Sequence, residues 1–106
     1  MPAAAARCRR LVGVRTPLTA AQLVEALDTL PAWSGDTSRI SRTARLDDAL
    51  RQAVAEAADA LDHHPVLEEQ PDGTTRLVLW THVRDAVTDL DVALAVRLDA
   101  LLPDAD

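Results

Sequence analysis

Apolar residues recur at helical spacing in three stretches of the chain. The spacing predicts helices over residues 19–30, 47–63 and 88–102, with Pro31 and Pro103 closing the first and the last. The apolar faces expected to pack in a core are Leu23, Ala26, Leu27 and Leu30 in the first helix, Leu46, Leu50, Ala53, Val54, Ala57 and Leu61 in the second, and Leu90, Ala93, Leu94, Leu98, Leu101 and Leu102 in the third.

Residues at the ends of these stretches match known helix-capping patterns. Thr19 and Gln22 have the spacing of a capping box, in which each side chain bonds the backbone N–H of the other residue. Thr88 and Asp91 have the same spacing with a shorter acid. Pro65 disfavours helical geometry at the residue before it, so the second helix is expected to end near residue 63.

Two further segments alternate apolar and polar residues as β-strands do. Residues 33–46 are expected to form two short strands around a Ser-Gly-Asp turn at 34–36, and residues 66–82 a hairpin around a Pro-Asp-Gly turn at 71–73. The order helix, two strands, helix, two strands, helix predicts an α+β fold. In this fold a four-stranded antiparallel sheet has three helices packed on one face.

Length and composition fit one compact domain. The chain has 106 residues, and we expect residues 11–106 to form the domain and residues 1–10 to be a disordered or loosely held tail. A net charge of -6 argues against nucleic-acid binding, which uses a basic surface. The single cysteine, Cys8, excludes an internal disulfide. No apolar run approaches the ~20 residues that span a bilayer, so we expect no membrane association and a cytoplasmic location.

The three histidines of the chain lie close together in sequence. His63 and His64 stand where a helix is expected to end and His82 where a strand is expected to end, positions from which side chains project into clefts. Histidine suits proton transfer because its reference pKa is about 6.5. Asp59 lies one helical turn before His63, and a carboxylate there favours a protonated ring. This arrangement is expected of a general acid that protonates a departing hydroxide.

Each of these features also has a simpler structural explanation. The His-His-Pro sequence can be a polar helix end, His82 can bond a nearby carbonyl, and Asp91 can be a helix cap alone. Three histidines and a carboxylate could bind zinc. However, adjacent residues on a helix point ~100° apart, so His63 and His64 do not readily chelate one ion and we expect no metal. The chain has no lysine, which excludes Schiff-base catalysis.

Taken in order, these motifs resemble the pterin-4a-carbinolamine dehydratase family over about residues 18–101. Leu-Thr opens the first helix at 18–19, and Leu-Pro-Ala-Trp-Ser follows at 30–34. The sharper match is a set of residues at the spacing of the family: Asp59, His63, His64 and Pro65, then Thr81 and His82, then Thr88 and Asp91.

The resemblance implies a reaction, a site and an assembly. The family dehydrates 4a-hydroxytetrahydrobiopterin to quinonoid dihydrobiopterin without a cofactor or metal, and its members form dimers or tetramers. We therefore expect a pterin substrate, no cofactor, and a homodimer or homotetramer. Carried over by position, the catalytic residues are His63, His82 and Asp91, and the substrate-binding residues are His64, Asp59, Pro65 and Thr81, with Asp59 also supporting His63.

The chain departs from the family pattern near the expected cleft. Asp72 stands where the family usually has an aromatic residue, Val66 where an acid is frequent, and residues 83–86 replace the usual glycines. The second helix is also shorter than usual by roughly one turn. Two other functions therefore stay open: a non-catalytic interaction or assembly protein with the same fold, and a related enzyme acting on another heterocyclic intermediate.

Overall fold

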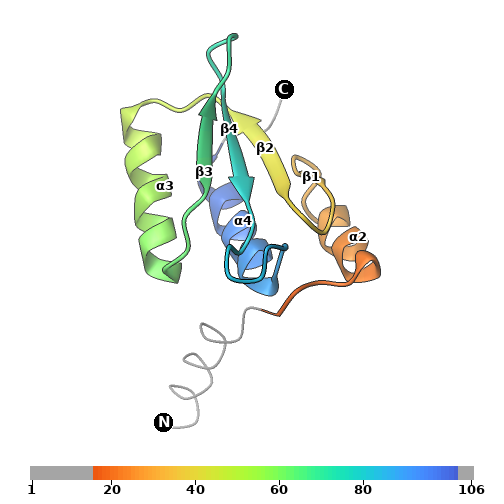
Figure 1. Ribbon diagram of the computed structural model, residues 1–106. Helices are drawn as coiled ribbons and strands as arrows, with labels where there is room; N and C mark the ends of the chain where they lie inside the picture. Colours follow the sequence, from red (N-terminus) through yellow and green to blue (C-terminus); the bar gives the residue numbers. More distant parts are fainter. Residues whose placement is uncertain (1–15, 103–106) are drawn as a thin grey trace, which may run out of the picture.

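The computed structural model describes residues 16–102, so the expected tail at 1–10, the domain start at residue 11 and Cys8 lie outside the described residues. Within 16–102, three helices and four strands follow the predicted order (Figure 1). No helix in this part of the chain has the length and apolar character to cross a membrane. The elements are α2 (Ala20–Asp28), β1 (Ser34–Gly35), β2 (Ile40–Ala44), α3 (Asp48–Leu61), β3 (Val66–Glu69), β4 (Thr75–Leu79) and α4 (Asp89–Leu101).

The four strands form one antiparallel sheet in the order β1-β2-β4-β3. The central strands β2 and β4 pair along their whole length, from Ile40 with Leu79 to Ala44 with Thr75. β3 and β4 are joined by the predicted turn, where Gly73 has a φ of 88° that favours glycine. The predicted hairpin is therefore confirmed.

The three helices and the sheet share one core. Figure 1 shows α4 behind the central strands, with α3 and α2 toward the two edges of the sheet. Side chains that alternate along β2 and β4 face this core, and all three helices contribute apolar residues to it. The α+β prediction is confirmed. The buried side chains include Ile40, Arg42 and Ala44 of β2, Thr75, Leu77 and Leu79 of β4, Leu23 of α2, Val54 of α3, and Leu94 and Leu98 of α4.

The buried face of α4 differs from the predicted face only in part, because the predicted Leu90, Leu94, Leu98 and Leu102 are buried. Ala93 and Leu101, which were expected in the core, are exposed, whereas Asp91 and Ala95 are buried. The buried face thus runs through Asp91, Ala95 and Leu98 at helical spacing. A prediction that counts only apolar residues leaves out Asp91, which is buried in the first turn together with Leu90.

The turn between the first two strands lies later than predicted. Ser34–Gly35 forms β1, and the chain reverses over residues 36–39. The Asp36 carboxylate accepts the backbone N–H of Ser38 at 2.8 Å and of Arg39 at 3.2 Å. These bonds, the one from Ser38 first, hold the pKa of the Asp36 carboxyl below its ordinary value. A Cβ on Gly35 would lie 2.1 Å from the Arg39 carbonyl oxygen, so this turn requires glycine.

Helix α3 ends at Leu61, two residues before the predicted end. Asp62 adopts the left-handed conformation, with φ 51° and ψ 44°. The backbone N–H of His63 donates to the carbonyl of Ala58, and that of Asp62 to the carbonyl of Asp59, as in a Schellman motif. Aspartate tolerates this conformation better than most non-glycine residues. Because the helix stops here, the His63 side chain leaves the helix face that its sequence spacing assigns to it.

Candidate active site

The predicted site residues gather at one end of the molecule. In Figure 1 the C-terminal ends of α3 and β4 and the N-terminal end of α4 lie at the same end of the sheet. His63 and His64 follow α3, Thr81 and His82 follow β4, and Asp91 lies in the first turn of α4. Segments that are distant in sequence therefore bring these side chains into one region.

A buried polar cluster forms around Asp91. One carboxylate oxygen of Asp91 contacts Nε2 of His63. The other oxygen accepts the Thr81 hydroxyl at 2.9 Å and the Thr88 backbone N–H at 2.8 Å. The two threonine hydroxyls also bond each other at 2.8 Å, and all four residues are buried. Both carboxylate oxygens are thus satisfied, as burial of a charged group requires.

Asp91 has the two roles that the sequence left as alternatives. Its side chain and that of Thr88 form a complete capping box at the start of α4. The same carboxylate contacts His63, which follows a different helix. A negative charge in the first turn of a helix is stabilised by the unpaired N–H groups there. The helix end therefore helps to keep a carboxylate beside the imidazole.

A second, exposed pair lies beside this cluster. Nε2 of His64 is 2.8 Å from a carboxylate oxygen of Asp59, and both side chains are exposed. The sequence prediction paired Asp59 with His63, and this pairing is wrong. The prediction assumed that the helix continues to residue 63, whereas the left-handed turn at Asp62 directs His63 toward Asp91.

The third histidine has a different neighbour. The His82 ring stacks on the Trp80 ring, with the centroids 4.4 Å apart and the planes 30° apart. Its chain neighbour Thr81 belongs to the buried cluster around Asp91. The structure thus connects His63, Thr81 and Asp91 by direct contacts, and His82 lies next to this cluster along the chain.

Of the positions near the expected cleft that depart from the family pattern, Val66 begins β3 and the others lie in two loops. In the β3–β4 turn, the carboxylate of Asp72 accepts the Thr74 hydroxyl at 2.6 Å and its backbone N–H at 2.9 Å. These bonds, the hydroxyl first, hold the pKa of the Asp72 carboxyl below its ordinary value. The loop at 82–86 is closed by a bond from the Thr81 N–H to the Ala86 carbonyl at 2.9 Å. Pro65 is half-buried and leads from His64 into β3.

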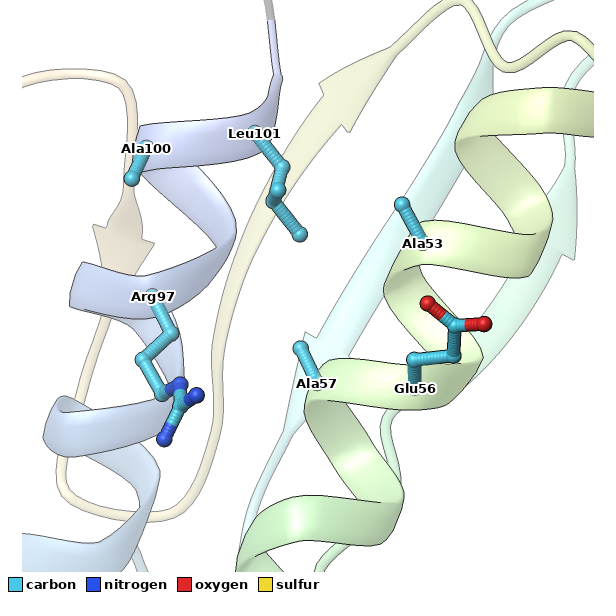
Figure 2. Close-up of a pocket in the computed structure, with 6 residues that line it drawn as sticks. All are labelled: Ala53, Glu56, Ala57, Arg97, Ala100 and Leu101. Atoms are coloured by element: carbon cyan, nitrogen blue, oxygen red, sulfur yellow. The ribbon is translucent and has the colours of Figure 1, made fainter.

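A groove of about 370 Å³ lies between α3 and α4 (Figure 2). None of the residues of the cluster around Asp91 lines it. Small and apolar side chains line it, together with one acidic and one basic residue. No histidine is among its lining residues, so it offers no proton-transfer group comparable to those around Asp91. The lining residues are Ala53, Glu56 and Ala57 of α3 and Arg97, Ala100 and Leu101 of α4. Within residues 16–102, no three His, Cys, Asp or Glu side chains are grouped to hold a metal ion.

Sequence reasoning missed two components of this region. The hydroxyl of Thr88 bonds Thr81 inside the cluster, although the sequence assigned Thr88 only as a helix cap. The stack of Trp80 on His82 was also missed. Their spacing of two residues at the end of a strand was a signal for it, because such residues lie on the same side of the chain.

Comparison with known proteins identifies the family. The family model described as pterin 4 alpha carbinolamine dehydratase matches residues 16–101. A protein of Streptomyces avermitilis, named "Putative pterin-4-alpha-carbinolamine dehydratase", is 40% identical over 93 residues, which cover 82% of this chain and 91% of that protein. A protein of Mycobacteroides abscessus with the same name is 36% identical over 88 residues, covering 77% of this chain and 92% of that protein.

A solved structure supports the same assignment. The crystal structure of a transcriptional coactivator/pterin dehydratase from Brucella melitensis superposes with a TM-score of 0.73 at 27% sequence identity. The match covers 83% of this chain and 100% of that chain. Since the family model spans nearly all described residues and the relatives align over most of their own length, the chain belongs to the pterin 4 alpha carbinolamine dehydratase family.

Proposed function

We propose that this protein is a dehydratase that removes water from 4a-hydroxytetrahydrobiopterin, a pterin-4a-carbinolamine, and releases quinonoid dihydrobiopterin. The observation that carries the proposal is the buried contact of His63 with Asp91, at the same end of the fold as His64 and His82. The names of the Streptomyces avermitilis and Mycobacteroides abscessus relatives support the substrate class.

The reaction requires one proton donor and one proton acceptor. The bond between C4a and its hydroxyl oxygen breaks, and the hydroxyl leaves as water after it accepts a proton. The adjacent ring nitrogen loses its proton, and the electron pair of that N–H bond forms the new C=N bond. No electrons pass between the pterin and another molecule. One positioned acid and one positioned base therefore suffice for the reaction.

In our proposal, His63 and His82 are the groups that donate one proton to the substrate and accept the other from it. Asp91 is buried and acts through His63: with Nε2 against the carboxylate, Nδ1 is the ring nitrogen left to face the substrate. Thr81 is buried too and donates its hydroxyl to Asp91. We therefore assign Thr81 to the support of Asp91 rather than to contact with the pterin.

His64 binds and orients the pterin in this proposal. Its ring is exposed and Asp59 bonds its Nε2, so the pair can rearrange to meet a substrate. Pro65 fixes the backbone directly after His64 and borders the bound heterocycle. These roles follow the family resemblance. The exposure of the His64 and Asp59 side chains agrees with the role of His64.

The test is the decay of a 4a-hydroxypterin generated in solution and followed by absorbance. Wild-type protein in catalytic amounts should accelerate the decay. The double variant His63→Ala, His82→Ala should lower the rate by at least about 100-fold, because acid–base catalysis contributes ~10²–10⁴. Arg76→Gln, which changes an exposed residue of β4, is the matched control and should keep the rate. Decay that excess wild-type protein leaves unchanged would eliminate the proposal.

Binding of a protein partner is a second candidate function, supported by the name "transcriptional coactivator" in the Brucella melitensis structure. It predicts that a protein co-purifies with this chain in stoichiometric amount and stays bound to the His63→Ala, His82→Ala variant. Absence of pterin binding by wild-type protein in calorimetry would favour this function over dehydration.

A further inference from the structure

Trp80 and His82 form a stack that continues to a third side chain. The guanidinium carbon of Arg39 lies 4.0 Å from the centroid of the Trp80 ring. The ring of His82 stacks on the same indole, with the centroids 4.4 Å apart. Residues two apart in an extended segment lie on one side of the chain, and the residue between them lies on the other. Accordingly, Thr81 points into the buried cluster while His82 is exposed.

Arg39 also binds the loop that carries His82. Its guanidinium donates to the Asp85 carboxylate at 3.3 Å, and the Asp85 backbone N–H donates to the His82 carbonyl at 3.1 Å. The contacts therefore form a closed series that runs from His82 to Trp80, Arg39, Asp85 and back to His82. The turn at 36–39, in which Asp36 accepts the Arg39 N–H, fixes the start of this series.

We propose that Trp80 and Arg39 are positioning residues that hold the imidazole of His82 in the orientation needed for proton transfer. The inference rests on the proposed dehydratase function. His63 and His64 each have a carboxylate beside the ring, from Asp91 and Asp59. The ring of His82 instead has the indole of Trp80 beside it. An exposed ring without such a support would sample several rotamers and face the substrate correctly for only part of the time.

The stack contributes more to this positioning than the ion pair does. The side chains of Arg39 and Asp85 are 41% and 83% exposed, so water and salt weaken their attraction. Ring stacking depends mainly on contact between surfaces, which salt does not screen. Trp80 is therefore the main positioning residue, and Arg39 stabilises the indole through a cation–π contact.

The test separates positioning from binding by kinetics and NMR. Trp80→Leu should lower kcat about tenfold, a part of the ~10²–10⁴ of acid–base catalysis, and leave KM within about twofold. Trp80→Phe keeps a ring for stacking and should restore most of kcat. In wild-type protein the ring current of the indole should move the His82 ring proton resonances upfield. Trp80→Leu should abolish this shift, and Trp80→Phe should keep part of it.

Arg39→Gln tests the second member of the stack. It should lower kcat about threefold and reduce the upfield shift of the His82 resonances, because the indole is held less firmly. Arg76→Gln is the matched control, since Arg76 is an exposed arginine of β4 that bonds Ser41 instead. It should change neither kcat nor the His82 resonances.

The outcomes distinguish this inference from the proposed function. Wild-type protein without dehydratase activity overturns the proposed function, while the His82 resonances still report whether the stack exists. A Trp80→Leu variant whose kcat is unchanged overturns the inference. If its KM is also higher, Trp80 is a substrate-binding residue instead of a positioning residue. If Trp80→Leu does not fold, Arg39→Gln decides: parallel losses of kcat and shift support positioning, and no change in either overturns it.

Discussion

His63 and His64 are neighbours in the chain, and each has Nε2 against a carboxylate oxygen, yet the two pairs differ in burial and reach. The side chains of His63 and Asp91 are 7% and 0% exposed, whereas those of His64 and Asp59 are 57% and 73% exposed. The first pair joins residues 28 apart and the second joins residues 5 apart. One contact therefore links the segment after α3 to α4, and the other links that segment to the last turn of α3.

Burial, rather than the contact itself, decides how much such a pair stabilises the fold. An exposed ion pair contributes only about 0–1 kcal/mol, because water and salt compete with it. Removing one partner of a buried pair lowers the free energy of unfolding by about 3–5 kcal/mol, because the remaining charged group has neither its partner nor water around it. The buried pair is thus suited to hold a ring in one place, and the exposed pair to exchange its partner for a ligand.

Removal of the buried carboxylate is the largest expected perturbation of this comparison. Asp91→Ala leaves His63, the Thr81 hydroxyl and the Thr88 N–H without their acceptor. The free energy of unfolding should fall by about 3 kcal/mol in urea denaturation. Asp59→Ala is the control on the exposed side and should stay within about 1 kcal/mol of wild type. Equal losses in the two variants would show that burial does not distinguish the pairs.

The turn that separates the two histidines is the next target. Asp62→Val places a β-branched residue in the left-handed conformation, which should cost about 1–2 kcal/mol. Asp62→Gly should be more stable than Asp62→Val by about the same amount, because glycine adopts this conformation without steric cost. Thermal and urea unfolding of both variants measure the difference. Similar stabilities of the valine and glycine variants would mean that the backbone of this turn is not under steric constraint.

The exposed pair should affect substrate handling more than stability. Asp59→Asn removes the charge beside His64 and should reduce the free energy of unfolding by no more than about 0.5 kcal/mol. If His64 orients the pterin, the loss of its partner should raise KM by roughly twofold, the equivalent of that energy. Steady-state kinetics at low and high salt check this, because the difference from wild type should shrink as salt screens the pair. A large stability loss would contradict the exposed character of the pair.

Asp72 is an exposed carboxylate without a histidine partner, and changes around it should alter stability least. Its pKa is lowered from an ordinary 3.8 by the Thr74 hydroxyl and then by the Thr74 N–H. The folded state therefore favours the carboxylate, and the stabilisation is present above the unfolded pKa and lost as pH falls through the lower folded pKa. Thr74→Val removes the hydroxyl bond and should raise the Asp72 pKa.

The measurement is the unfolding free energy across the acid range. In Thr74→Val the loss of stability between neutral pH and about pH 2 should be smaller than in wild type. Thr43→Val, at an exposed position of β2, is the control for adding a valine to the sheet surface. A larger acid-dependent loss in Thr74→Val would contradict the assigned cause.

The parts of the fold that depend on local sequence could be predicted. Thr19 and Thr88 both form the expected capping boxes. The alternation within residues 33–46 predicted strands, and β2 buries every second residue: Ile40, Arg42 and Ala44. These features involve residues within four positions of each other, and the sequence shows such relations directly.

The partners of the site residues could not be predicted, because they come from other elements. The contact of His63 with Asp91 depends on the turn at Asp62 and on the packing of α4, neither of which is visible in helical periodicity. The contact of Arg39 with Trp80 joins a turn to the end of another strand. Burial of a carboxylate on an otherwise apolar face also lies outside any pattern of apolar residues.

The two roles of Asp91 couple local opening of α4 to the state of the histidine. Fraying of the first helical turn would release the Thr88 N–H and the His63 ring in one event, because a single carboxylate holds both. The rate of amide hydrogen exchange at Thr88 should therefore report the fraction of molecules in which His63 is released from Asp91. A solvent condition that protects this one amide should also preserve the contact of the imidazole with Asp91.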